Sequence, residues 1–152
     1  MTTFNLFLFF GNMVSIMGAE DITYKSVGSL KKGAYIMIDG EPCKVVEISK
    51  SKLGKHGAAK ARIVAIGAFT GQKRTIIKST GDKVEVPIIN RKDAQVLSIR
   101  GKYVELMDLE TFETFEAPVA DESLLQRIDS GSTVEVWFLA GKPLVMRARR
   151  VE

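Results

Sequence analysis

The sequence has 152 residues, of which 45% are hydrophobic and 26% are charged, with 22 Lys/Arg against 18 Asp/Glu. This length fits one ordinary domain or two small ones, and this composition excludes a chain that is disordered throughout. The single cysteine and single histidine exclude an internal disulfide and a zinc site of the Cys/His type within one chain. A lone cysteine also favours a reducing, cytoplasmic location.

The beginning of the chain is strongly apolar. The stretch Phe4–Phe10 lacks the basic region of a signal peptide, and the apolar run through Met17 is too short to span a membrane. Met13 and Met17 are both possible starts, and polar, turn-forming sequence follows Met17. We therefore expect residues 1–16 to be a mis-called start or a disordered leader, and we expect no membrane partner.

From Ser29 onward, short runs of strand-forming residues alternate with turn signals. The first two runs are separated by Gly40-Glu41-Pro42, which predicts a hairpin turn. The predicted strands are Tyr35–Asp39, Lys44–Ser49, Ala61–Ala68, Thr75–Ser79 and Lys83–Val86. Their spacing predicts a small, highly bent barrel. Its thin core is expected to contain Ile36, Ile38, Val46, Ile48, Ile63, Ile66 and Ile76.

Charge is distributed unevenly along the chain. Residues 18–86 contain thirteen Lys/Arg and seven Asp/Glu, a net charge of +6, whereas residues 87–152 contain nine and eleven, a net charge of −2. The first half therefore has the electrostatic character of a protein that binds polyanions. Pro87 lies where the sign changes, so we expect a domain boundary at Val86–Ile88, between domains 17–86 and 87–152.

The second half has the element order of an OB-fold, which is five strands with a helix between the third and the fourth. Asp121 is a suitable N-cap for this helix, and Gly131 lies just beyond its end. The predicted elements are strands Ala94–Arg100, Tyr103–Asp108 and Thr114–Pro118, helix Ala120–Ile128, and strands Thr133–Leu139 and Leu144–Val151. The expected fold class is therefore all-β, a small, highly bent barrel followed by an OB-fold.

The most informative segment is a basic loop in the first half. From Lys44 to Arg62 there are six basic side chains and one acidic side chain. The expected loop, Lys50–Ala58, exceeds the usual hairpin length of about two to five residues. Unusually long loops are often functional.

Lys55 and the only histidine, His56, lie between two glycines in this loop. Gly54 and Gly57 allow backbone angles that are closed to other residues and keep side-chain bulk away. Another macromolecule can therefore reach Lys55 from several directions. The alternative is a mobile turn that carries a solvated lysine.

Enzymatic interpretations gain less support from the sequence. The loop lacks the spacing of a phosphate-binding loop, and a lysine nucleophile needs burial or a cationic neighbour to lower its pKa. His56 has no identifiable carboxylate to orient it, so it is more simply a polar turn residue. Polar and aromatic residues alternate over Thr111–Glu116. This pattern favours a solvated face over paired carboxylates for the acidic residues Asp108, Glu110, Glu113 and Glu116. Cys43 and Trp137 are expected to be core or half-buried residues.

The loop closely resembles the defining motif of the translation initiation factor 5A family, the archaeal and eukaryotic counterpart of bacterial elongation factor P. The likeness runs from about Gly18 to the C-terminus, and position 58, usually His or Ser in the family, is Ala here. The matching segments are Ser51–Arg62, Glu41-Pro42-Cys43, Val86-Pro87-Ile88-Ile89 and Met107–Phe115. The absence of long polar insertions favours the archaeal branch.

The resemblance implies an SH3-like N-terminal barrel, a C-terminal OB-fold and a specific function. Family members are ribosome-binding factors, not enzymes, and they use no cofactor. Deoxyhypusine synthase transfers an aminobutyl group from spermidine to the lysine that aligns with Lys55, and in eukaryotes a hydroxylase completes hypusine. The factor then acts on peptidyl-tRNA near the ribosomal E site and promotes peptide-bond formation at stalled sequences such as proline runs.

The remaining basic residues of the loop suit contacts with ribosomal RNA phosphates, which give affinity and orientation without reading sequence. These residues are Lys50, Lys52, Lys60 and Arg62. The alternative is a general RNA-binding module of barrel plus OB-fold, without modification, in which Lys55 is one phosphate contact among several.

Overall fold

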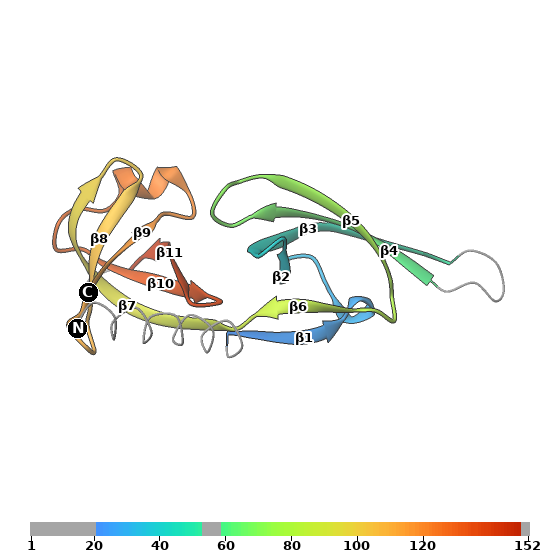
Figure 1. The fold of residues 1–152 in the computed structure, drawn as a ribbon. Helices are drawn as coiled ribbons and strands as arrows, with labels where there is room; N and C mark the ends of the chain where they lie inside the picture. The colour runs from blue at the N-terminus through green and yellow to red at the C-terminus, as the bar shows by residue number, and fades with distance from the viewer. Residues whose placement is uncertain (1–20, 53–58, 150–152) are drawn as a thin grey trace, which may run out of the picture. The chain divides into compact units, whose positions relative to one another are not determined.

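The computed structural model describes residues 21–52 and 59–149, and the chain divides after Ile88 into two compact units (Figure 1). The division lies at the end of the expected boundary segment, Val86–Ile88. Both units consist of antiparallel strands, and the described residues include only two short 3-10 helices. The predicted all-β class, a bent barrel followed by an OB-fold, is confirmed. The expected leader, residues 1–16, lies outside the described residues.

The first unit is a curled sheet closed by a two-stranded ribbon. Strands β2, β3, β4 and β5 form the sheet in that order, and β1 pairs with β6. Side chains from the sheet, from η1 and from β6 enclose one hydrophobic core. The elements are β1 (Ile22–Ser26), η1 (Val27–Ser29), β2 (Tyr35–Ile38), β3 (Glu41–Lys52), β4 (Ala59–Gly67), β5 (Lys73–Ser79) and β6 (Lys83–Pro87).

Two predictions about the strands of the first unit are wrong. No strand was expected before Ser29, but β1 pairs with β6 along its whole length. The turn between the first two strands is at Asp39 and Gly40, whose φ angles of 51° and 79° are both positive. Two such residues form the turn that matches the twist of a hairpin. As a result Pro42, expected in the turn, lies within β3 opposite Met37.

The predicted core is correct for Ile36, Ile38 and Ile63, which are buried, while Ile48 and Ile76 pack against it partly buried. The prediction that Val46 and Ile66 belong to the core is wrong. A bulge between Val45 and Glu47 inserts one extra residue into β3, so Val45 is fully buried in place of Val46. Ile66 is 38% exposed because the residues before and after it on β4, Ala65 and Gly67, occupy the inner face.

The second unit is a five-stranded barrel with strand order β11-β10-β7-β8-β9. A parallel bridge between Val119 and Val145 brings the end of β9 to β11 and closes the sheet. The predicted N-cap is confirmed, because the Asp121 side chain accepts a hydrogen bond from the Ser123 amide. The elements are β7 (Ile89–Arg100), β8 (Tyr103–Asp108), β9 (Thr114–Pro118), η2 (Glu122–Gln126), β10 (Thr133–Leu139) and β11 (Lys142–Ala148).

Candidate functional site

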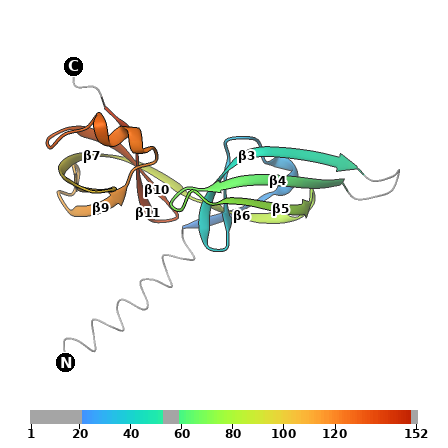
Figure 2. The same cartoon turned by 90° about the horizontal axis from the view of Figure 1, so that it is seen from above.

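The candidate site is carried by the hairpin of β3 and β4. Strand β3 has 12 residues and β4 has 9, and their pairing continues as far as Lys52 opposite Ala59. In Figures 1 and 2, these two strands extend beyond the other strands of the first unit. The expected loop Lys50–Ala58 was therefore too long, because Lys50, Ser51 and Lys52 belong to the paired strand.

The predicted modification residues fall between the two paired strand ends. Gly54, Lys55, His56 and Gly57 lie outside the described residues, as does the side chain of Lys52. Their roles stay predictions. The structure does describe the strand ends on either side of this segment. It also describes three of the basic residues expected to contact RNA, which are Lys50, Lys60 and Arg62.

Lys50 ties the hairpin to the rest of the first unit. Its Nζ donates a hydrogen bond to the carbonyl oxygen of Gly28 in η1, with a length of 2.7 Å. The Gly28 amide in turn donates to the Thr80 carbonyl at 2.9 Å, and the Thr80 amide donates to the Ala59 carbonyl at 2.9 Å. Both strands of the hairpin are thus linked through η1 and the β5–β6 turn, close to their paired ends, Lys52 and Ala59.

Glycine at position 28 suits this arrangement. A Cβ atom there would lie 3.2 Å from the Thr80 carbonyl oxygen, tighter than an ordinary contact. Any other residue would press against the backbone group that joins Gly28 to Ala59. Sequence reasoning missed Gly28 and Thr80, because they are distant in sequence from the hairpin and carry no motif.

Lys60 and Arg62 lie on the opposite face of the hairpin from Lys50. On β4 both are exposed, whereas Ala61 between them is fully buried and pairs with Lys50. Arg62 lies 4.0 Å from Glu47, and both side chains are more than half exposed. An ion pair in that setting contributes little. Lys60 and Arg62 therefore form the described part of one cationic face, and Lys50 does not belong to it.

Glu41 holds the other end of β3 in place. The residue is only 8% exposed. Its carboxylate accepts hydrogen bonds from the Thr70 amide and hydroxyl, both at 3.0 Å, and from Arg74 Nη2 at 3.2 Å. Burial by itself raises the pKa of Glu41, but the bonds from Thr70 and Arg74 outweigh it and hold that pKa below its usual range. This carboxylate fixes the β4–β5 turn against β3.

The other residues considered for chemistry have structural partners. Cys43 is fully buried, and burial raises the pKa of its thiol, so it has the character of an inert core thiol. Asp108 is buried and lies 3.0 Å from Lys92, whereas Glu113 and Glu116 are exposed.

Trp137 is half-buried. The guanidinium of Arg91 lies 4.4 Å from its ring centroid, within the range of a cation–π contact.

Two absences apply to the described ranges, 21–52 and 59–149. They contain no group of three or more His, Cys, Asp or Glu residues that could hold a metal ion. No helix within these ranges is long and apolar enough to cross a membrane.

Two protein-family models match the chain. Residues 21–82 match the model described as translation initiation factor 5A-like, N-terminal. Residues 88–149 match the model described as eukaryotic elongation factor 5A hypusine, DNA-binding OB fold. Together they span most of the two units.

Proteins similar in sequence are named translation initiation factor 5A, in agreement with the first family model. Translation initiation factor 5A of Aeropyrum pernix is 45% identical over 133 residues, which cover 84% of this chain and 96% of that protein. The factor of Sulfurisphaera tokodaii is 50% identical over 130 residues, covering 84% and 98%.

Solved structures agree with these relatives. Eukaryotic translation initiation factor 5A from Methanococcus jannaschii superposes with a TM-score of 0.78 at 46% identity, covering 86% of this chain and 96% of that one. A family protein from Naegleria fowleri gives a TM-score of 0.67 at 31% identity, covering 86% and 100%. On sequence and fold together, this chain is a translation factor that belongs to the translation initiation factor 5A family.

Proposed function

We propose that this chain binds the ribosome and promotes peptide-bond formation at stalled sequences, such as runs of proline, through a hypusine or deoxyhypusine group on Lys55. The observation that carries the proposal is the braced β3–β4 hairpin, whose paired strand ends, Lys52 and Ala59, flank the segment with Lys55. The family model that matches the second domain includes hypusine in its description, which supports the modification. The chain would work in the cytoplasm, where translation takes place.

The proposed modification explains why a lysine is needed. Deoxyhypusine synthase would transfer the aminobutyl group of spermidine to the Lys55 amine. One C–N bond of spermidine breaks, a C–N bond to Nζ forms and 1,3-diaminopropane leaves, so that two cationic nitrogens lie on a slim aliphatic arm. Such an arm can place charge-assisted hydrogen bonds on the end of peptidyl-tRNA. The catalytic step then belongs to the ribosome, and this factor contributes by orienting the tRNA end, which lowers the entropic part of the barrier.

The cationic face of the hairpin has a separate role in this proposal. Lys60 and Arg62 are exposed on that face, where they can contact ribosomal RNA phosphates. These contacts give affinity that falls with salt and do not read sequence. Gly54 and Gly57 would keep the approach to Lys55 narrow, His56 would support the turn as a polar residue, and Lys52 would add to the positive charge beside Lys55.

The test is a comparison of Lys55→Arg with Lys55→Ala in translation of a message that encodes a proline run. Arginine keeps the positive charge, but its guanidinium stays protonated and cannot accept the aminobutyl group. We therefore expect both variants to lose activity to the same extent, and Lys60→Ala to retain more activity than either. An active Lys55→Arg variant would contradict the mechanism.

The same experiment separates the alternative, a general RNA-binding module. That function predicts salt-sensitive binding to free RNA, with Lys55 substitutions no more harmful than Lys60→Ala. The proposed function predicts the opposite order in the translation assay.

A further inference from the structure

The turn between β8 and β9 presents an aromatic side chain in an unusual conformation. Phe112 is 67% exposed and its φ angle is 63°, in the left-handed region that bulky residues rarely adopt. Leu109, three residues earlier in the same turn, is 38% exposed. An apolar pair of this kind at the end of a hairpin is exposed to any protein that approaches it.

Asp108 holds the turn rigidly. Its carboxylate accepts hydrogen bonds from the amides of Glu110 at 2.8 Å and Thr111 at 3.2 Å, and its other oxygen lies 3.0 Å from Lys92 Nζ. The Phe112 amide donates to the Asp108 carbonyl at 2.8 Å. The bond from Glu110 and then the bond from Lys92 are the main reasons that the pKa of Asp108 lies below its usual range. A single buried side chain thus holds the backbone of the turn that carries the exposed Phe112.

The conformation of Phe112 costs free energy that an ordinary turn residue would avoid. A left-handed backbone costs a residue other than glycine about 1–2 kcal/mol. Strained residues persist where the surrounding structure over-determines them, and they concentrate at functional sites. Asparagine or glycine would fit this position without strain, so the presence of an exposed phenylalanine points to a use for its ring.

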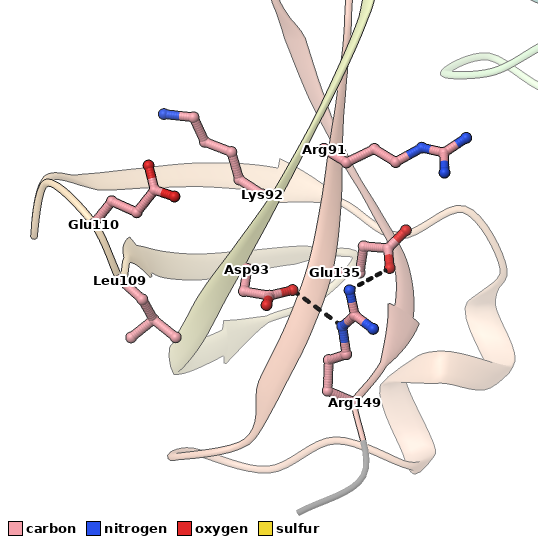
Figure 3. Close-up of a pocket in the computed structure, with 7 residues that line it drawn as sticks. All are labelled: Arg91, Lys92, Asp93, Leu109, Glu110, Glu135 and Arg149. Carbon is pink, nitrogen blue, oxygen red and sulfur yellow. Dashed lines mark hydrogen bonds and ion pairs between the residues drawn. The ribbon is translucent and has the colours of Figure 1, made fainter.

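A charged hollow of about 290 Å³ lies beside this turn, and Leu109 forms part of its wall (Figure 3). Arg149 crosses the hollow and contacts Asp93 at 3.0 Å and Glu135 at 2.8 Å. Among the residues that the structure describes, neither Arg91 nor Glu110 has an ion-pair partner. Of the six charged side chains that line the hollow, Arg149, Asp93 and Glu135 are therefore paired with each other. Lys92 pairs with Asp108 and Arg91 lies over the Trp137 ring, which leaves Glu110 as the charge that can meet a partner.

The charges around Phe112 do not suit a nucleic acid. The hollow is lined by three cations, Arg91, Lys92 and Arg149, and three anions, Asp93, Glu110 and Glu135. Glu113 follows Phe112 directly in the sequence and Glu110 lies two residues before it, and both are exposed. Phosphate groups would be repelled by the acidic turn, whereas lysine or arginine side chains of a protein would be attracted.

We propose that the β8–β9 turn is a protein-docking surface, in which Phe112 enters an apolar pocket bordered by basic side chains of the partner. Exposed aromatic anchors of this kind carry much of the affinity of protein interfaces. The inference rests on the proposed function for the source of the partner. A factor that works on the ribosome meets basic ribosomal proteins, so the partner is a ribosomal protein and not ribosomal RNA.

The first test measures the binding of the full chain to purified ribosomes. Phe112→Asn removes the ring, and asparagine accepts the left-handed backbone, so the variant should fold. We expect its affinity to fall at least tenfold. The control is Tyr103→Thr, which removes another exposed aromatic side chain, 54% exposed, at the start of β8; its affinity should change less than twofold.

The second test identifies what Phe112 touches. The photoreactive residue p-benzoylphenylalanine replaces Phe112, and the ribosome complex is irradiated. We expect a covalent adduct with a ribosomal protein. An adduct with ribosomal RNA, or no adduct, would overturn the proposal, as would stronger ribosome binding by a Glu110→Lys, Glu113→Lys variant.

The outcomes also separate this proposal from the one on which it rests. If the unaltered chain binds ribosomes and Phe112→Asn binds equally well, only the docking surface is refuted. If the unaltered chain does not bind ribosomes at all, both proposals fail.

Discussion

Substitution of Glu41 by glutamine tests the buried network at the start of β3. The glutamine oxygen can still accept the hydrogen bond from the Thr70 amide, which is 3.0 Å from the carboxylate. Its amide nitrogen would then face Arg74 Nη2, which is now 3.2 Å from the other carboxylate oxygen. One charge-assisted hydrogen bond is lost, and two donors are brought together.

The size of the effect follows from this contact. Hydrogen bonds to charged groups contribute about 1.5–3 kcal/mol. Arg74 is 24% exposed and keeps its bond to Asp39 at 2.8 Å, so the lower end of that range applies. We expect Glu41→Gln to lower the local stability of the first unit by about 1.5 kcal/mol, which corresponds to roughly tenfold faster amide exchange.

Amide hydrogen exchange of the full chain is the appropriate assay. The amide of Thr70 should exchange faster in Glu41→Gln. The control is Glu47→Gln, the same change on the same strand at a side chain that is 64% exposed. The only tryptophan, Trp137, belongs to the second unit, and its fluorescence should report no change. Equal exchange in the two variants would refute the reasoning.

The difference should also depend on pH. The pKa of Glu41 lies below its usual value in the folded chain, so its carboxylate stabilises the fold fully above the unfolded pKa, about 4.3. That stabilisation is lost as the pH falls through the folded pKa. The difference in local stability between the unaltered chain and Glu41→Gln, measured by amide exchange, should therefore be largest near neutral pH and should become smaller on acidification. A gap that stays constant would contradict the network's role.

Three further predictions concern single residues. Lys50→Met removes the hydrogen bond to Gly28, so it should speed amide exchange in η1 and slow attachment of the aminobutyl group, independently of salt. Lys60→Met should affect neither, and equal effects of the two variants would show that the Lys50–Gly28 bond does not hold the hairpin. Gly67→Ala should destabilise the first unit by about 1–3 kcal/mol, because its Cβ would lie 2.5 Å from a carboxylate oxygen, whereas Gly81→Ala meets nothing within 4 Å; comparison of urea denaturation curves tests this. Phe112→Asn should raise the stability of the second unit by about 1 kcal/mol, measured by Trp137 fluorescence, and a loss of stability would contradict the assignment of strain.

Local patterns predicted much of the second unit. Alternating residues bounded by turn signals located Tyr103–Asp108, Thr114–Pro118 and Thr133–Leu139 with the bounds that the structure gives. The cap at Asp121 was also readable, because its side chain satisfies an amide in the next turn of the chain. These features depend on neighbours in sequence, which a single sequence displays.

Other features depend on contacts between distant segments. The bulge at Val46 changes which residues of β3 face the core, and no local signal marks it. The Asp39-Gly40 pair is a known hairpin signal, but Gly40-Glu41-Pro42 resembles a turn as well, and the sequence alone does not decide between the two. Proline can occupy a strand where its missing amide is not needed.

The candidate site shows the same contrast. Glycines on both sides identified Lys55 from the sequence, together with the resemblance to a known family. The bonds that hold the hairpin, from Lys50 to Gly28 and from Thr80 to Ala59, join residues about twenty positions apart. Lys50 was therefore expected in a loop contacting RNA, when its described contact is with the protein backbone.

The most direct test of the proposed function is intact-mass and peptide mass spectrometry of the protein purified from its own cells. The expected result is one aminobutyl-derived adduct, located on Lys55 and absent from Lys50 and Lys60. An unmodified Lys55 in protein that is active in translation would contradict it.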